Sequence, residues 1–223
     1  MAKKGCISIC KNNYLKVVYA HRNAQLDVLG KKVVKMCTTL GVDGLNELYD
    51  KIILVDEDAP MTPEQIQAYK KYMPEQLWKE DLDWSTAIGY TKDATKPLMD
   101  GFPYVVDYAG FLPSWRNRFR YLIDLDRNVL QVTKGGLEVI SAPEEVFFSS
   151  ENYVDKICPC VVGTFPLDNI PADWLEQCDA FWGTVMLEAK PYADDELARD
   201  SNVFESDPDG QHDYHKMRFF LGR

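Results

Sequence analysis

The chain has 223 residues, of which 46% are hydrophobic and 12% aromatic, and it carries 35 acidic against 25 basic side chains for a formal net charge of −10. This length and apolar content suffice for one sizeable core, and no apolar run approaches the roughly 20 residues that a membrane-spanning helix needs. The net negative charge disfavours sequence-independent binding of nucleic acid, because phosphate groups repel it. Six cysteines with no apolar leader segment before them indicate free thiols in a cytoplasmic protein rather than a disulfide framework.

The N-terminal residues predict a β-hairpin. Residues 5–10 (GCISIC) and 14–21 (YLKVVYAH) are two strand-like runs. They are joined at Asn12 and Asn13, and asparagine tolerates the positive φ that a tight hairpin turn requires.

A helical period follows this hairpin. Apolar residues recur at steps of three and four from Leu26 to Leu40, and Gly41 stands where a C-cap glycine belongs. A second short helix is expected at residues 45–52. Residues 51–58 (KIILVDED) are either the end of that helix or a short buried strand.

A further helix is expected to begin at Thr62. Thr62 would be its N-cap, Pro63 its first residue, and Gln65 would reach back to the cap. We expect this helix to end before Pro74. Residues 74–117 are rich in aromatic residues and interrupted by prolines, which predicts short helices and loops.

Residues 119–132 (FRYLIDLDRNVLQV) form the clearest pattern of the chain, a second β-hairpin. We expect Asn128 to take positive φ in a three-residue turn, and Asp126 to cap that turn with its side chain. Gly135 and Gly136 then predict a change of chain direction before a short strand, EVFFS.

The next stretch predicts a strand and a helix. Residues 158–167 (CPCVVGTFPL) have strand character, and their proline favours an edge position. A short helix is expected next, with Asp168 or Asn169 as its cap and with Trp174 and Cys178 on its apolar face.

These elements together predict an α+β fold, with a mixed, largely antiparallel sheet built from hairpins and helices packed on it. No repeat and no Gly-, Pro- or Ser-rich linker divides the chain, so residues 1–188 are expected to form a single domain. Residues 189–223 are expected to be an acidic C-terminal extension, since eight carboxylates lie between Asp194 and Asp213 against Arg199 alone. Such a run is typical of a solvated tail or an interaction arm.

Four short motifs also stand out. Their residues are Gly5; Tyr19, His21 and Gly30; Tyr121, Ile123, Asp124, Leu125 and Asp126; and Phe165, Pro166, Leu167, Ile170 and Pro171. They resemble the motifs M-G-T-R-G, Y-x-H-x-D-x-Y-P-x-G-x-G, Y-x-I-D-L-D and F-P-L-x-x-L-P of a family of small uncharacterised bacteriophage, bacterial and fungal proteins. The chain departs from these motifs at Ala2, Lys3, Lys4, Asn23, Gln25, Leu26 and Val28. The resemblance extends over residues 1–178 and implies a fold layout without an established activity.

Cys6 is the clearest candidate nucleophile. It opens an apolar strand, CISI, that is similar to the first strand of N-terminal nucleophile (Ntn) hydrolases, and this similarity leaves an Ntn-like layering open for the fold. In those enzymes the free α-amine of the nucleophile is the general base, whereas five residues precede Cys6 here. Pairing within the N-terminal hairpin would instead bring His21 near Cys6 as the base. The alternatives are a buried, inert Cys6 and a hydrogen-bonding His21 at a strand end.

The sequence predicts neither a metal nor a cofactor. Cys158, Cys160, His212 and His215 have the residue types of a zinc site, but a single residue separates the two thiols where zinc sites favour two to four. The stretch ESDPDG resembles half of a calcium loop, although a lysine stands where such a loop needs its closing glutamate. Glycine-rich phosphate loops, dinucleotide fingerprints, G-x-S-x-G and H-E-x-x-H are all missing from the sequence, which disfavours the commonest enzyme classes.

Aromatic residues of the irregular segment supply the candidate binding surface, namely Trp78, Trp84, Phe111 and Trp115. Packing of a loop-rich layer would explain these residues equally well. Because no catalytic set is complete, the leading hypothesis is a non-catalytic intracellular protein, encoded by a phage or a related mobile element, that binds a protein partner. The alternatives are a cysteine amidohydrolase that uses Cys6 with His21 as base, and an acidic mimic of nucleic acid. A catalytic Cys6 would be partly exposed, whereas a structural one would be buried.

Overall fold

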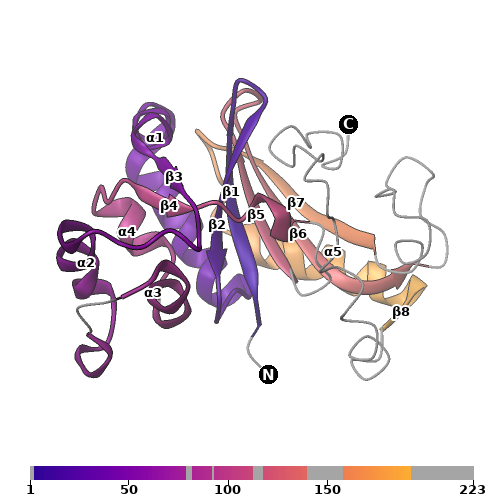
Figure 1. The fold of residues 1–223 in the computed structure, drawn as a ribbon. Coiled ribbons are helices and arrows are strands. Elements are labelled where there is room, and N and C mark those ends of the chain that lie inside the picture. The colour runs from indigo at the N-terminus through magenta and orange to yellow at the C-terminus, as the bar shows by residue number, and fades with distance from the viewer. Residues whose placement is uncertain (1–2, 79–81, 92, 113–117, 140–157, 192–223) are drawn as a thin grey trace.

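The computed structural model describes residues 3–78, 82–91, 93–112, 118–139 and 158–191 (Figure 1). Its main sheet has the strand order β2–β1–β5–β6–β7, and β8 pairs with β6. β1 and β5 are parallel, whereas the other neighbouring strands are antiparallel. This arrangement confirms the predicted α+β fold with a mixed, largely antiparallel sheet. The strands are β1 (Gly5–Lys11), β2 (Tyr14–Ala20), β5 (Phe119–Asp124), β6 (Val129–Val139), β7 (Cys158–Pro166) and β8 (Ala189–Pro191).

Both predicted hairpins are present. Asn12 and Asn13 form the two-residue turn between β1 and β2 with φ of 53° and 61°, and Asn128 has φ of 56° in the second turn. That second turn has four residues rather than three, because Asp124 pairs with Val129.

The two turns are held by aspartates in a way that the sequence did not predict. The carboxylate of Asp126 accepts hydrogen bonds from the backbone N–H groups of Asn12 and Asn13, at 2.8 and 3.0 Å, and therefore stabilises the other hairpin. Asp124 stabilises its own turn instead, since its Oδ1 accepts from the N–H groups of Asp126 and Arg127. The expectation that Asp126 caps its own turn was wrong.

One face of the sheet is covered by helices α1 (Lys31–Lys51) and α5 (Trp174–Glu188) (Figure 1). A π-helical turn, η1 (Leu26–Gly30), leads into α1. α1 is broken at Gly41, whose φ and ψ of 62° and −178° are not helical, so the predicted helix end at this glycine is confirmed. The core between helices and sheet is apolar and includes Ile7, Ile9, Val33, Cys37, Tyr121, Ile123 and Trp174.

Two expectations about the second half of the chain were wrong. β6 continues through Gly135 and Gly136, where the register with β7 shifts instead of the chain turning, because glycine also suits a β-bulge. α5 begins at Trp174, later than a cap at Asp168 or Asn169 would place it, and it spans 15 residues. β7 is the predicted strand, at the edge of the order, while the expected EVFFS strand lies outside the described residues.

A helical layer lies beside the edge strand β2. It contains a two-stranded parallel ribbon and short helices: β3 (Ile53–Val55), β4 (Tyr104–Val106), α2 (Pro63–Tyr69), α3 (Trp84–Tyr90), α4 (Thr95–Met99), and the 3-10 turns η2 (Lys70–Tyr72), η3 (Glu75–Leu77) and η4 (Ala109–Phe111). The predicted capping box of α2 is present, with Thr62 Oγ1 and Gln65 Oε1 each accepting the other residue's N–H. β3 is the strand expected in KIILVDED, but Ile53 is 51% exposed rather than buried. This layer has a second core of its own, built around Tyr69, Trp84 and Phe102.

The sheet face opposite α1 and α5 combines apolar and polar residues. A third apolar cluster there joins Cys6, Cys10 and Leu122 to Ala109 and Leu112 of the η4 region. The strand registers place further buried polar side chains on the same face, namely Ser8, Arg120, Asp124, Gln131 and Thr133.

No helix in the part of the chain that the structure describes is long and apolar enough to cross a membrane. β8 occupies the first three residues of the predicted C-terminal extension and pairs with β6, so these three belong to the sheet. The acidic run from Asp194 to Asp213 lies outside the described residues.

Candidate functional site

The register of the N-terminal hairpin places Cys6 opposite Tyr19. The Tyr19 hydroxyl lies 3.2 Å from Nδ1 of His21, so Tyr19 stands between the predicted nucleophile strand and the predicted base. Cys6 itself is fully buried, with its Sγ 4.0 Å from the Ser8 hydroxyl. By the criterion stated above, Cys6 has the burial of a structural cysteine.

The neighbouring strand brings a cation toward Cys6. Arg120 on β5 is the Cα partner of Cys6 and is itself only 7% exposed. Cys6 thus has an arginine on one adjacent strand and Tyr19 on the other. A positive charge beside a thiol favours the thiolate, yet a nucleophile must also be reached by its substrate.

The predicted aromatic surface residues have different environments. Trp84 is 1% exposed and belongs to the core of the helical layer. Phe111 packs edge-on against the Tyr19 ring at 4.8 Å, whereas Trp78 is 43% exposed and donates its indole N–H to the Lys70 carbonyl. Trp115 lies outside the described residues. Of the three that the structure describes, only Trp84 lines the cavity between the helical layer and β2.

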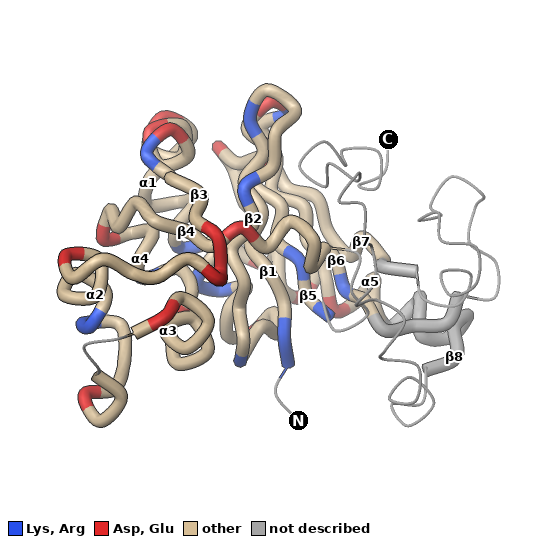
Figure 2. The backbone as a smooth tube through the Cα atoms, viewed as in Figure 1, with Lys and Arg blue, Asp and Glu red and all other residues tan. Residues whose placement is uncertain are grey.

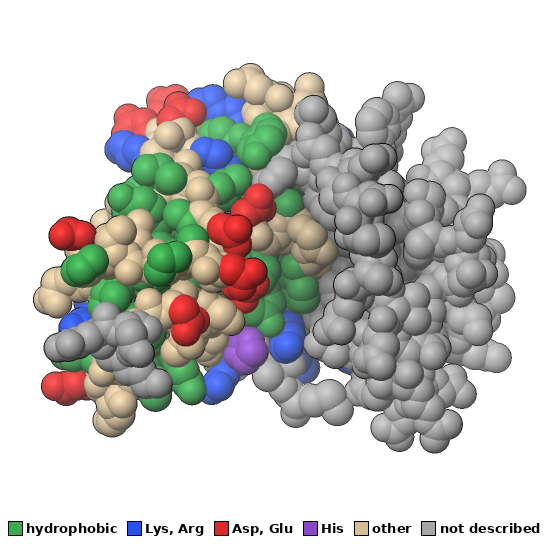
Figure 3. Space-filling model, in the orientation of Figure 1, with side chains coloured by type: hydrophobic (Ala, Val, Ile, Leu, Met, Phe, Trp, Pro, Cys, Tyr) green, Lys and Arg blue, Asp and Glu red, His purple; other side chains and the backbone are tan. Residues whose placement is uncertain are grey.

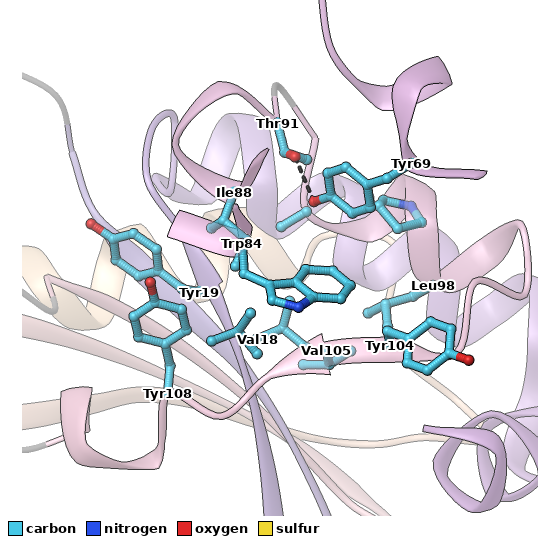
Figure 4. A pocket seen from close by; sticks show the side chains of 13 residues that line it. Val18, Tyr19, Tyr69, Trp84, Ile88, Thr91, Leu98, Tyr104, Val105 and Tyr108 are labelled. Carbon is cyan, nitrogen blue, oxygen red and sulfur yellow. Dashed lines mark hydrogen bonds between the residues drawn. The ribbon is translucent and has the colours of Figure 1, made fainter. Parts of the chain in front are cut away.

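A cavity of about 40 Å³ opens where the helical layer meets β2 (Figure 4). We call it the aromatic cleft. The described residues that line it are all uncharged. Its walls carry the aromatic rings of Tyr19, Tyr69, Trp84, Tyr104 and Tyr108 beside aliphatic residues such as Val18, Ile88 and Leu98. Figure 4 shows Val18 and Tyr19, Trp84, and the pair Tyr69 and Thr91 on different sides of the same space. The cleft therefore forms between elements far apart in the sequence.

Two tyrosine hydroxyls of the cleft, those of Tyr69 and Tyr108, are hydrogen-bonded to neighbouring side chains. Thr91 donates its only hydroxyl hydrogen to the Ala87 carbonyl at 2.9 Å, so Tyr69 must donate to Thr91 Oγ1 at 2.7 Å. Burial raises the pKa of Tyr69 to about 12. Tyr108 donates to Oε1 of Glu57 at 2.6 Å, and burial together with that carboxylate raises the pKa of Tyr108. Both phenols stay neutral at physiological pH, and the rings present apolar surface to the cleft.

A second, polar hollow adjoins the aromatic cleft. We call it the basic hollow, because His21, Arg22 and Lys32 line it together with Asp93. Tyr19, Thr91 and Ala94 line both spaces. The aromatic cleft and the basic hollow are therefore neighbours.

The charges of the basic hollow leave an excess of positive charge. Asp93 is engaged on both oxygens: Oδ2 pairs with Lys32 Nζ at 2.8 Å, and Oδ1 accepts from the backbone N–H and hydroxyl of Thr95 at 3.0 and 2.7 Å. Burial alone would raise the pKa of Asp93, but Lys32 and Thr95 outweigh it and lower that pKa. The pKa of His21 is lowered by burial and by the charges of Lys4 and Arg22, so its imidazole is neutral at pH 7.

Most of this arrangement was missed at the level of sequence. Trp84 was predicted as a binding residue, and Tyr19 and His21 were noted for their strand, but Tyr69 and Tyr104 were not assigned to a binding site. Nothing in the sequence connects Lys32 with Asp93, because only the fold brings these two residues together. Proximity in three dimensions is the missing information.

Potential metal ligands are found at the hairpin turns rather than in the cleft. Ligand atoms of Cys10, Asp124 and Asp126 lie within 4.8 Å of one another. Both carboxylates already accept backbone N–H groups of the two turns, which accounts for their position without an ion. His212 and His215 of the weighed zinc set lie outside the described residues.

No protein-family model matches the chain, and neither a curated protein nor a solved structure is similar to it at a significant level. The resemblance to the family of bacteriophage, bacterial and fungal proteins therefore stays a prediction.

Proposed function

We propose that this protein acts by binding rather than by catalysis, and that the aromatic cleft is its ligand-binding site. The observation that carries this proposal is the cleft itself, an apolar space walled by five aromatic rings between two separate cores. Ligand sites are typically concave and mostly apolar, with a few polar groups that orient the ligand. The basic hollow beside the cleft supplies such polar groups.

The size of the cleft limits what enters it. A water molecule needs roughly 10–15 Å³ of such space, so about 40 Å³ holds a group of three or four heavy atoms. A short alkyl group fits this volume, whereas a phenyl ring requires the walls to separate.

Neutral alcohols of increasing chain length test this proposal directly. We expect hexan-1-ol to shift the indole N–H signal of Trp84 in ¹H–¹⁵N spectra, because Trp84 lines the cleft. Trp174, which is buried between α5 and the sheet, serves as the internal control and should not shift. Ethanol should bind more weakly, since it leaves part of the cleft unfilled and each methylene withdrawn from water contributes about 0.8 kcal/mol.

A matched pair of variants localises the binding. Ala94→Leu places a larger side chain in the cleft wall and should abolish the Trp84 response, while Ala68→Leu on the exposed side of α2 should preserve it. A folded wild-type protein whose Trp84 signal is unaffected by every alcohol would contradict the proposal.

The cysteine amidohydrolase remains a second candidate because of one observation, the position of Cys6 between Arg120 and the Tyr19–His21 pair. This candidate requires that Cys6 become accessible to a substrate. The thiol reactivity of Cys6 distinguishes the two candidate functions.

A further inference from the structure

The aromatic cleft and the basic hollow share a wall, and their chemical characters differ. Tyr19 carries its ring in the cleft and its hydroxyl toward His21 of the hollow. A ligand that fills both spaces must therefore have an apolar part and a polar head on opposite sides of Tyr19.

The charge of that head follows from the side chains that remain available in the hollow. Asp93 is already paired with Lys32 and Thr95, so its negative charge is compensated by Lys32 within the hollow. Arg22 is exposed and forms no hydrogen bond or ion pair with any residue that the structure describes. A free guanidinium is a bidentate donor suited to a carboxylate.

Basic residues near the hollow reinforce this preference. Lys3 and Lys4, just before β1, are basic, as the blue segment near the N-terminal end of the tube shows (Figure 2). The positive charge of Lys4 acts on His21. In Figure 3 the histidine lies beside basic side chains, with acidic side chains on the other side. Glu57 is bonded to Tyr108, and Asp93 is the one acidic side chain among the described residues that line either space.

We propose that the ligand is a small amphiphilic carboxylate, with a short alkyl chain in the aromatic cleft and its carboxylate against Arg22 in the basic hollow. This inference rests on the proposed binding function and names the ligand class of the same site. The cleft holds three or four heavy atoms of the alkyl chain, and the remaining carbons lead past Tyr19 to the carboxylate in the hollow.

Three probes with the same chain and different head groups test the inference: hexanoate, hexan-1-ol and hexylammonium. The readout is the Trp84 indole signal, identified by its loss in Trp84→Phe. We expect hexanoate to bind most tightly and hexylammonium most weakly. Equal affinities for hexanoate and hexan-1-ol, or the tightest binding for hexylammonium, would overturn the carboxylate assignment while leaving the cleft as a binding site. If hexan-1-ol and hexanoate both fail to bind, the proposed function fails as well.

Arg22→Gln separates the head-group contact from the cleft. It should weaken hexanoate about five-fold, the usual effect of losing one partly exposed charged contact, and leave hexan-1-ol unchanged. Lys35→Gln is the matched control, because it removes the same charge from an exposed position on α1 away from the hollow.

A second readout uses the wild-type protein. Bound hexanoate should raise the pKa of His21, since the negative charge of hexanoate offsets those of Lys4 and Arg22. Hexan-1-ol should leave this pKa unchanged. If neither Arg22→Gln nor His21 responds to hexanoate selectively, the carboxylate lies elsewhere and the inference is wrong.

Discussion

The reactivity of a single residue, Cys6, distinguishes most directly between the two candidate functions, ligand binding and amide hydrolysis. Its side chain is fully buried in the β1 strand and belongs to an apolar cluster with Leu122 and Leu112. A thiol in such a position reacts only when the structure opens. We expect iodoacetamide to alkylate Cys6 at least about 100-fold more slowly in the native protein than in urea, because opening a core strand costs several kcal/mol.

Peptide mass spectrometry of the native protein at several pH values measures this rate. Cys37 is the internal standard, since it is equally buried and burial raises its pKa to about 12. Cys6 should be protected as well as Cys37. Alkylation of Cys6 ahead of Cys37 below pH 8 would instead support a nucleophile activated by Arg120 or His21, and the hydrolase would become the leading candidate.

At the scale of single residues, the sequence predicted backbone conformations more reliably than hydrogen-bond partners. The positive φ of Asn12, Asn13 and Asn128 follows from the tolerance of asparagine for this conformation, and it was predicted. The role of Asp126 was not predictable, because its two backbone hydrogen-bond donors lie 113 and 114 residues away along the chain. The residues of a turn predict its backbone conformation, but they do not predict which distant residue a side chain binds.

At the scale of elements, the break in α1 depends on one glycine. The φ and ψ of Gly41 lie in a region that side chains rarely adopt, although a Cβ there would meet no described atom within 4 Å beyond the adjoining backbone of α1 and the two neighbouring residues. The cost of Gly41→Ala is therefore backbone strain without a clash, and we expect the free energy of unfolding to fall by about 2 kcal/mol. Urea unfolding followed by circular dichroism measures this change.

Gly89→Ala is the matched control for that prediction. Gly89 lies within α3, has no neighbour within 4 Å of a Cβ position and does not have a positive φ. Alanine should stabilise the helix there by roughly 0.5–1 kcal/mol. An unchanged stability of Gly41→Ala beside a stabilised Gly89→Ala would mean that α1 can continue through position 41 as one helix.

Elements with a strong local pattern were predicted, and elements defined by their surroundings were not. The hairpins, the capped α2 and the glycine break in α1 each carry their own signal within a few residues. β4 has three residues and exists because it pairs with β3, about 50 residues earlier in the chain. β6 passes Gly135 and Gly136 because its neighbour β7 continues the ladder beyond them. Tertiary pairing overrode local preference in both places.

The part of the molecule that the structure describes has two main cores, which we expect to differ in stability. This difference affects how a ligand reaches the aromatic cleft. The sheet core is enclosed by β1, β5 and the long helices α1 and α5. The helical layer relies on helices of seven, seven and five residues and on a ribbon of three residue pairs. Helices this short are marginal on their own, so their stability comes from packing on the Trp84 core and on β2.

We therefore expect the helical layer to open before the sheet does. Amide hydrogen exchange should be about ten-fold or more faster in α3 and β4 than in β1 and β5, because partial unfolding of the layer leaves the sheet core intact. Such an opening separates the walls of the aromatic cleft, which lie on β2 and on the layer, and gives a ligand its route of entry. Since a bound ligand touches both sides, hexanoate should slow exchange in α3 and leave α5 unchanged. Equal protection throughout, with no response to hexanoate, would show that the two cores unfold as one unit and that the cleft does not gate access in this way.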